Sequence, residues 1–107
     1  MYSKGRVELH QIMQERVVRS FLDIIILKLL QTGPKWGYEI ISEIRDKYGV
    51  SLSAGTTYPL LYSLEERGLV EGTWEAQKKR GRRVYKITRK GIEVLAVGER
   101  TLREVLK

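Results

Sequence analysis

The sequence predicts a mainly α-helical domain that carries one small β-hairpin. Two helical patterns, at residues 35–48 and 54–67, are joined by a turn too short to let the helices pack antiparallel. The period then changes from helical to alternating at residues 69–75 and 82–88, on either side of a basic loop. This order of elements is that of a winged helix-turn-helix, flanked here by an N-terminal arm and a C-terminal helix.

The N-terminal arm, residues 1–18, is predicted to contain a helix from Val7 to Val18. Its apolar side chains recur at helical spacing with polar residues between them: Leu9, Ile12, Met13 and Val17. An amphipathic helix of this kind needs a surface that covers its apolar side. We therefore expect the arm to pack against another surface of the assembled protein.

Residues 21–30 are apolar on nearly every side, which predicts a buried helix. The three consecutive isoleucines, Ile24–Ile26, also favour a buried strand. A strand of this length would be unusual, and the Q-T-G-P sequence that follows is typical of a helix end. We therefore predict a helix, and the charged Asp23 and Lys28 exclude a membrane span.

The next helix is predicted to open at residues 35–38 and to end at Gly49. Its inner side consists of apolar and aromatic residues: Ile40, Ile41, Ile44 and Tyr48. Only Val50–Ser53 separate it from the following helix, so the two must cross at a steep angle.

The helix after the turn, residues 54–67, has an unusual outer face. Its inner side carries Thr57, Leu60, Leu61 and Leu64, and Gly68 ends it. Ser53 is a plausible N-cap. The outer face of the first two turns carries small, hydroxylated or aromatic groups where a surface helix usually has Lys and Glu. Such a face is suited to close approach by another molecule.

Six residues of this helix and its cap are predicted to contact nucleic acid: Ser53, Thr56, Thr57, Pro59, Tyr62 and Ser63. Their hydroxyls can bond to base edges or phosphate, and Pro59 offers an apolar contact to a thymine methyl group. For Thr57, packing into the core is the alternative. For Ser63, the alternative is a hydrogen bond to its own helix.

The loop of the predicted hairpin is strongly basic. The cations crowd together with no acidic residue among them: Lys78, Lys79, Arg80, Arg82 and Arg83. Such a run can serve solubility alone, but its field favours a polyanion, so we predict contact with the phosphate backbone. Lys35, near the start of the preceding helix pair, is predicted to contact the backbone as well.

The C-terminal helix, capped by Thr88, has more apolar surface than a small monomer needs. Gly98 in its middle would allow a bend or a close backbone approach. We predict a homodimer in which the N-terminal arm of one subunit meets the C-terminal helix of the other. The dimerisation residues are expected to be Leu9, Ile12, Met13, Leu95, Leu102, Val105 and Leu106.

Composition narrows the function. The chain has 20 Lys and Arg against 13 Asp and Glu, a formal charge of +7, which favours DNA, RNA or an acidic membrane surface. It has no Cys, and its one histidine, His10, cannot form a metal cluster by itself. Catalytic groups are missing as well, so we expect neither an enzyme nor a cofactor or metal. We also expect a soluble, cytoplasmic protein, because no leader or membrane segment is recognised.

Four motifs in order resemble the PadR family of transcriptional regulators: R-S-F-L-D-I-I-I-L-K-L-L, W-G-Y-E-I, G-T-T-Y-P-L-L-Y-S-L-E-E-R-G-L-V and G-R-R-V-Y-K-I-T-R-K-G. The resemblance covers roughly residues 19–95. It implies a homodimer that binds palindromic promoter DNA, mostly as a repressor, with the wing along the backbone or minor groove. Tyr38 matches the W-G-Y-E-I position, where its hydroxyl and the first-turn amides could bind phosphate. A buried tyrosine is the alternative.

We therefore divide the chain into an N-terminal arm (1–18), a winged helix-turn-helix DNA-binding domain (19–88) and a C-terminal dimerisation helix (89–107). The predicted function is a sequence-specific regulator that binds an inverted repeat in double-stranded DNA. An interaction module for RNA or an acidic protein is the alternative. Multidrug-sensing members of the family stack ligands on a tryptophan of the C-terminal helix, and residues 92–107 contain no aromatic residue. A small-molecule effector thus stays unassigned.

Overall fold

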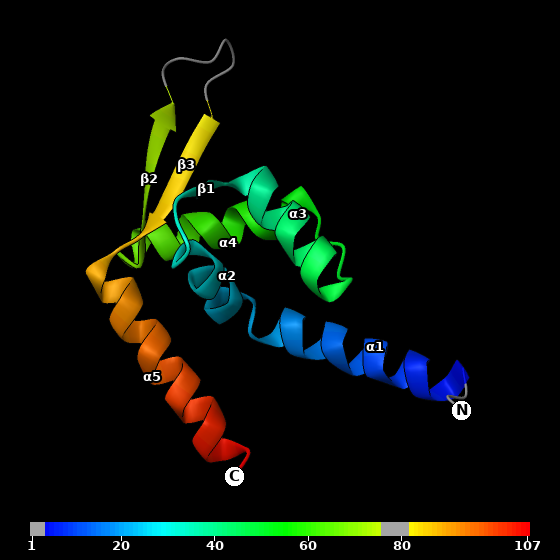
Figure 1. The fold of residues 1–107 in the computed structure, drawn as a ribbon. Helices are drawn as coiled ribbons and strands as arrows, with labels where there is room; N and C mark the ends of the chain where they lie inside the picture. The colour runs from blue at the N-terminus through cyan, green and yellow to red at the C-terminus, as the bar shows by residue number, and fades with distance from the viewer. Residues whose placement is uncertain (1–3, 76–81) are drawn as a thin grey trace.

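The computed structural model describes residues 4–75 and 82–107, and it confirms a mainly helical fold with a small antiparallel sheet (Figure 1). The elements follow in this order: α1 (Lys4–Ser20), α2 (Leu22–Leu30), β1 (Lys35–Trp36), α3 (Gly37–Tyr48), α4 (Ala54–Glu66), β2 (Val70–Glu75), β3 (Arg82–Ile87) and α5 (Arg89–Val105). Within these described ranges, no helix is both long and apolar enough to span a bilayer.

The hydrophobic core lies where α2, α3, α4 and α5 meet. Its fully buried side chains come from all four helices: Ile26, Leu27, Leu30, Ile40, Ile44, Leu61, Leu64 and Leu95. Helix α2 supplies three of these eight, more than any other helix, because it is apolar around most of its circumference. The prediction of a helix at residues 21–30, in preference to a strand, is therefore confirmed.

The predicted helix-turn-helix is formed by α3 and α4. Helix α3 ends at Gly49, whose φ of 69° lies in the left-handed region that glycine adopts readily. Ser53 caps α4 by accepting a hydrogen bond from the Thr56 amide. At the other end, Gly68 has a φ of 75°, and the Leu69 amide donates to the Leu64 carbonyl. The C-terminal end of α3 and both ends of α4 are thus capped at the residues that the sequence predicted.

The sheet contains one strand more than the predicted hairpin. Its order is β1-β3-β2, and both pairs are antiparallel. In β1, Lys35 pairs with Tyr85 and Trp36 with Val84. The prediction that residues 35 and 36 open the helix is therefore wrong, since they form a strand and α3 begins at Gly37. Pairing with β3 provides the backbone amide and carbonyl groups of these two residues with hydrogen-bond partners outside the helix.

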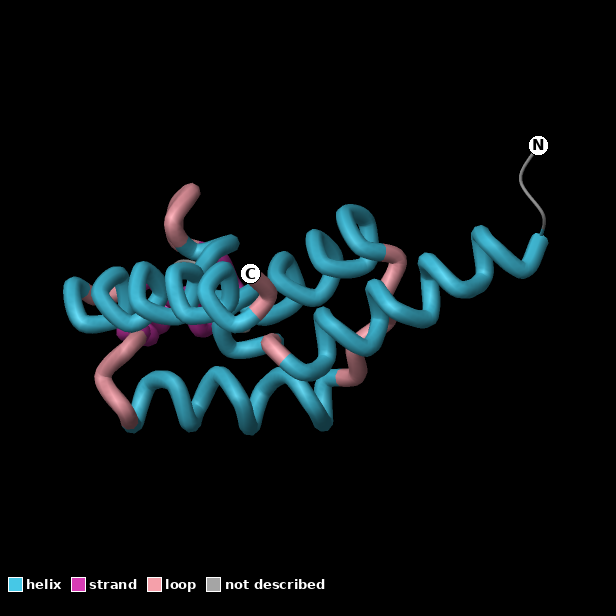
Figure 2. Tube along the Cα trace, turned by 90° about the horizontal axis from the view of Figure 1, so that it is seen from below, coloured by secondary structure: helices cyan, strands magenta, loops and turns pink. Residues whose placement is uncertain are grey.

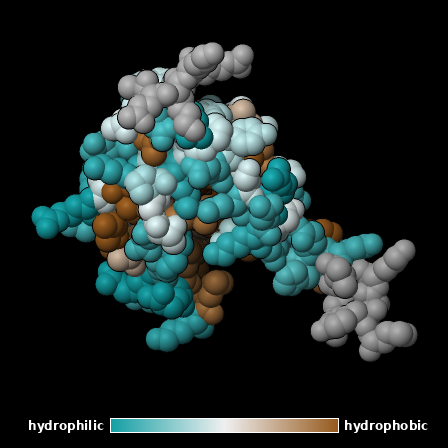
Figure 3. All heavy atoms as spheres, turned by 45° about the horizontal axis from the view of Figure 1, so that its top comes forward, coloured by the Kyte–Doolittle hydropathy of each residue, from teal (hydrophilic) through white to brown (hydrophobic). Residues whose placement is uncertain are grey.

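Helices α1 and α5 leave the core in different directions, on the side away from the wing formed by β2 and β3 (Figure 1). Seen from below, the N-terminal end of α1 extends beyond the rest of the molecule (Figure 2). Hydrophobic side chains gather mainly in the lower part of the molecule, away from the wing (Figure 3). Helix α1 runs to Ser20, past the predicted boundary at residue 18.

Helix α5 packs closely on α2, and this changes the interpretation of two of its residues. Leu95 is fully buried in its own subunit, so its predicted role in the dimer is wrong. A Cβ added to Gly98 would lie 2.7 Å from the Cδ1 of Ile24, as expected for a close backbone approach. The large apolar residues left exposed on α5 and at its C-cap are Ile92, Val97, Val105 and Leu106.

Candidate nucleic-acid interface

The N-terminal half of α4 presents its outer face to solvent. Ser53, Thr56 and Pro59 are exposed, and Tyr62 keeps 65% of its surface accessible. Ser63 is half-buried at the edge of this face. These residues form the predicted recognition surface, and the structure places them together, between the cap of the helix and its third turn.

Thr57 does not belong to that surface. Its side chain is fully buried, and its hydroxyl donates to the Ser53 carbonyl at 3.0 Å. The predicted contact between Thr57 and nucleic acid is therefore wrong, and the alternative of inward packing holds. A threonine fits there because this hydrogen bond satisfies its hydroxyl within the helix.

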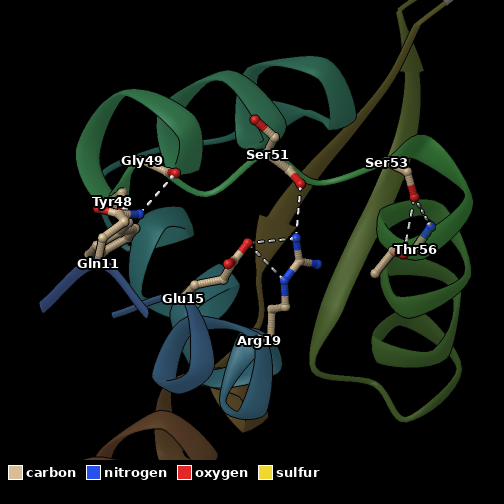
Figure 4. Close-up of polar contacts among 8 residues, drawn as sticks. All are labelled: Gln11, Glu15, Arg19, Tyr48, Gly49, Ser51, Ser53 and Thr56. Atoms are coloured by element: carbon tan, nitrogen blue, oxygen red, sulfur yellow. Dashed lines mark hydrogen bonds and ion pairs between the residues drawn. The ribbon is translucent and has the colours of Figure 1, made fainter. Parts of the chain in front are cut away.

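The hydroxyls at the start of α4 are already organised. The Ser53 Oγ lies 3.1 Å from the Thr56 amide nitrogen, whose hydrogen bond it accepts, and 3.1 Å from the Thr56 Oγ1 (Figure 4). Each hydroxyl has further lone pairs or a rotatable proton for a second partner. The pair can thus meet phosphate or a base edge without first breaking the cap.

Tyr58 is an exposed aromatic residue beside this face and is not among the predicted site residues. Its accessible surface is 39% of the maximum, and its ring covers Gly37 so closely that a Cβ there would lie 2.6 Å from the ring. Tyr58 precedes Tyr62 by four residues, and side chains at that spacing are neighbours on a helix. The four-residue spacing of the two tyrosines is the sequence feature that could have placed Tyr58 in the predicted site.

The start of α3 lies close to Tyr58, but its residues differ from expectation. The Lys35 ammonium pairs with Glu43 at 3.0 Å and its side chain is only 13% exposed, so the predicted backbone contact is not favoured. Tyr38 is exposed and stacks on Trp36, with ring centroids 5.6 Å apart, which excludes the buried alternative. The carboxylate of Glu39 accepts a hydrogen bond from the Trp36 amide at 3.0 Å and adds negative charge at the predicted phosphate position.

Two wing cations are paired with carboxylates, contrary to the expectation of a run without acids. Arg82 bonds to Glu75 across the hairpin, at 2.9 and 3.1 Å, and its guanidinium lies 4.5 Å from the centroid of the Trp36 ring. Arg83 bonds to Glu65 of α4. The Glu65 carboxylate also accepts the Gly72 amide at 3.3 Å, so it links α4 to both long strands.

These contacts indicate a structural role for Arg83. The hydrogen bond to Glu65 raises its pKa above the usual value, so the guanidinium stays charged and held. Next to it, burial raises the pKa of the Tyr85 hydroxyl. Arg83 therefore fixes the wing relative to α4, and a phosphate would have to compete with Glu65 for it. Lys78, Lys79 and Arg80 lie outside the described residues.

The family model described as "Transcriptional regulator PadR-like family" matches residues 26–97. A curated relative, the transcriptional activator GvpE of Haloferax mediterranei, is 34% identical over 80 residues, which are 75% of this chain. The aligned part is 40% of that relative, so this chain spans well under half of its length.

Solved structures show the same fold. A PadR family regulator from Eggerthella lenta has a TM-score of 0.80 at 26% identity, over 97% of this chain and 91% of that one. Bacillus subtilis PadR, solved in complex with operator DNA, has a TM-score of 0.66 at 28% identity. That match covers 71% of this chain and 45% of the other.

Proposed function

Since the chain belongs to the PadR-like family of transcriptional regulators, we propose that it binds an inverted repeat in double-stranded DNA as a homodimer. In this proposal α4 is the recognition helix and enters the major groove. Its exposed Ser53, Thr56, Pro59 and Tyr62 meet base edges or adjacent phosphates. The wing loop follows the backbone.

The observation that carries the proposal is the outer face of α4. It is exposed, free of acidic groups over its first two turns, and lined by hydroxyls and an aromatic ring. The charge of +7 adds long-range attraction to DNA. RNA is less favoured, because the deep major groove of an A-form duplex does not admit side chains on a helix.

A binding titration tests the proposal. Fragments selected from random duplexes should contain an inverted repeat, and the protein should prefer them over scrambled duplexes of the same composition by at least about a thousandfold. A preference for single-stranded or duplex RNA, or equal affinity for all duplexes, would support the interaction-module alternative.

Substitutions on α4 should change which sequences are preferred. We expect Tyr62→Ala or Thr56→Ala to lower affinity for the selected site by about 1 to 3 kcal/mol, with little change for scrambled DNA. Glu66→Ala, on the same helix, is the matched control, because Glu66 lies in the last turn. Competition between the selected site and its single-base variants measures the effect. Equal losses on every sequence would show that α4 does not read bases.

The exposed apolar residues at both ends of the chain support a dimer. They include Leu9, Ile12 and Met13 of α1, Val105 at the end of α5 and its C-cap residue Leu106. Next to α1, an open groove of about 500 Å³ is bounded by Met13, Val17, Ile25 and Tyr48 among others, with room for apolar side chains of a second subunit. We expect Ile12→Asp to yield monomers in sedimentation at micromolar concentration, whereas Glu8→Asp should not. A monomeric parent chain would contradict the proposal.

We further propose repression as the outcome of binding. A dimer on a promoter blocks polymerase by its volume alone, whereas activation requires an additional contact. The activator GvpE contains much sequence outside the aligned region, so its activity is not carried over to this chain. A reporter gene whose promoter overlaps the selected site should fall in expression when the protein is present, and a rise would reverse the assignment.

A further inference from the structure

Helix α1 holds the turn between α3 and α4 from outside. The Nε2 of Gln14 donates to the Tyr48 carbonyl at 3.0 Å. The Nε2 of Gln11 donates to the Gly49 carbonyl at 3.2 Å (Figure 4). Carbonyl groups at the C-terminal end of a helix have no partner within that helix. The two glutamines therefore supply partners from a segment more than thirty residues earlier in the chain.

Arg19 makes a third contact, one turn further along α1. Its guanidinium donates to the Ser51 carbonyl at 3.2 Å and to Glu15 at 3.1 Å (Figure 4). Glu15 lies one helical turn before Arg19 and so orients the guanidinium toward the turn. The contacts of α1 thus extend from the end of α3 to the residue two before the cap of α4.

The other side of the turn is anchored in the core. Val50 is fully buried and Leu52 nearly so, while Ser53 caps the first turn of α4 through the Thr56 amide. The turn is therefore fixed from both sides. Apolar packing holds its inner side, and hydrogen bonds to α1 hold its outer side. A shift of α1 would move the turn and, with it, the start of the recognition helix.

The opposite face of α1 is apolar and exposed. Leu9, Ile12, Met13 and Val17 keep between 46% and 60% of their surface accessible. At 100° per residue, this stripe lies on the other side of the helix from Gln11, Gln14 and the buried Val18. One helix thus connects the face proposed for the second subunit with the turn that places α4.

We propose that Gln11, Gln14 and Arg19 are positioning residues, which set the location of the recognition helix and link it to the dimer face of α1. The inference rests on the proposed function, since it assumes that α4 reads DNA. None of the three needs to touch DNA. Their effect is to narrow the range of positions that α4 samples, so that fewer conformers fail to match the groove.

The test is the double substitution Gln11→Met and Gln14→Met in the full chain. Methionine is close to glutamine in length, has no donor and leaves the net charge unchanged. We expect amide hydrogen exchange over residues 50–57 to accelerate. Affinity for the selected inverted repeat should fall on the order of tenfold, as for the loss of two ordinary hydrogen bonds. Affinity for scrambled duplex should stay the same.

Gln31→Met is the matched control, because Gln31 is an exposed glutamine at the end of α2. It should change none of these quantities. The ratio of the two DNA affinities separates positioning from a loss of folded protein, which would lower both equally. If the double variant keeps both the exchange rates and the ratio of the parent, the inference is wrong. If the parent shows no preference among duplexes, the proposed function fails instead, and the exchange rates still decide whether α1 holds the turn.

Discussion

Affinity for the inverted repeat should fall by roughly a thousandfold or more when salt is raised from about 50 to 200 mM, if the dimer contacts about six to ten phosphates. The reason is counterion release, since each neutralised phosphate frees cations that were condensed on the DNA. Each subunit carries a formal charge of +7, so enough cations are present. Plotted as logarithms, affinity against salt should be a straight line.

The ion pair of Arg83 with Glu65 predicts that Arg83 contributes little to this slope. Arg83 already has a carboxylate partner in Glu65, whereas Arg80 is expected from the sequence alone to contact phosphate. Arg80→Gln should therefore reduce the slope by about two per dimer, one for each subunit, and Arg83→Gln by much less. Titrations at four or five salt concentrations measure both. Equal reductions would show that Glu65 releases Arg83 to the DNA.

Local signals were sufficient to predict most of the fold. Helix α4 could be located from its inner stripe, from Ser53 as its cap and from Gly68 after its end, because each acts through its immediate neighbours. The exposed hydroxyl and aromatic face followed from the same periodicity. By contrast, β1 has only two residues, so it carries no period, and its pairing with β3 joins segments far apart in the chain.

The sequence does not show which of the predicted backbone cations are already paired within the protein. The predicted contacts of Lys35, Arg82 and Arg83 with the DNA backbone rest on their charge, and the sequence does not reveal their partners. Those partners, Glu43 for Lys35 and Glu65 for Arg83, depend on helix and strand packing. Similarly, an apolar pattern shows that a residue such as Leu95 is covered, but it cannot show which subunit covers it.

Gly91→Ala should lower the free energy of unfolding by about 2 to 4 kcal/mol, the upper range for overpacking at a site that cannot relax. Gly91 is buried in the first turn of α5. An added Cβ would lie 2.1 Å from the Leu69 carbonyl oxygen and 2.7 Å from the Cγ1 of Ile87. The Leu69 carbonyl cannot easily retreat, because it accepts the Thr88 amide at 3.1 Å and belongs to a buried residue at the start of the wing.

Gly98→Ala in the same helix is the matched control. There the new Cβ would meet the end of the Ile24 side chain, which can rotate, and alanine improves helix propensity by about 1 kcal/mol. We expect its stability to stay within about 1 kcal/mol of the parent. Urea unfolding at one protein concentration, chosen so that dimer dissociation affects all samples alike, measures both variants.

The contrast between the two glycines tests how α5 is attached to the wing. If Gly91 holds the first turn of α5 against Leu69, the direction in which α5 leaves the domain is set at that contact. The spacing between the two DNA half-sites bound by the proposed dimer then depends on this contact. The reason is that the exposed Val105 and Leu106, which are proposed to contact the second subunit, lie at the far end of α5. Equal stability of the two variants would mean that the first turn of α5 can shift freely and that something else determines the spacing.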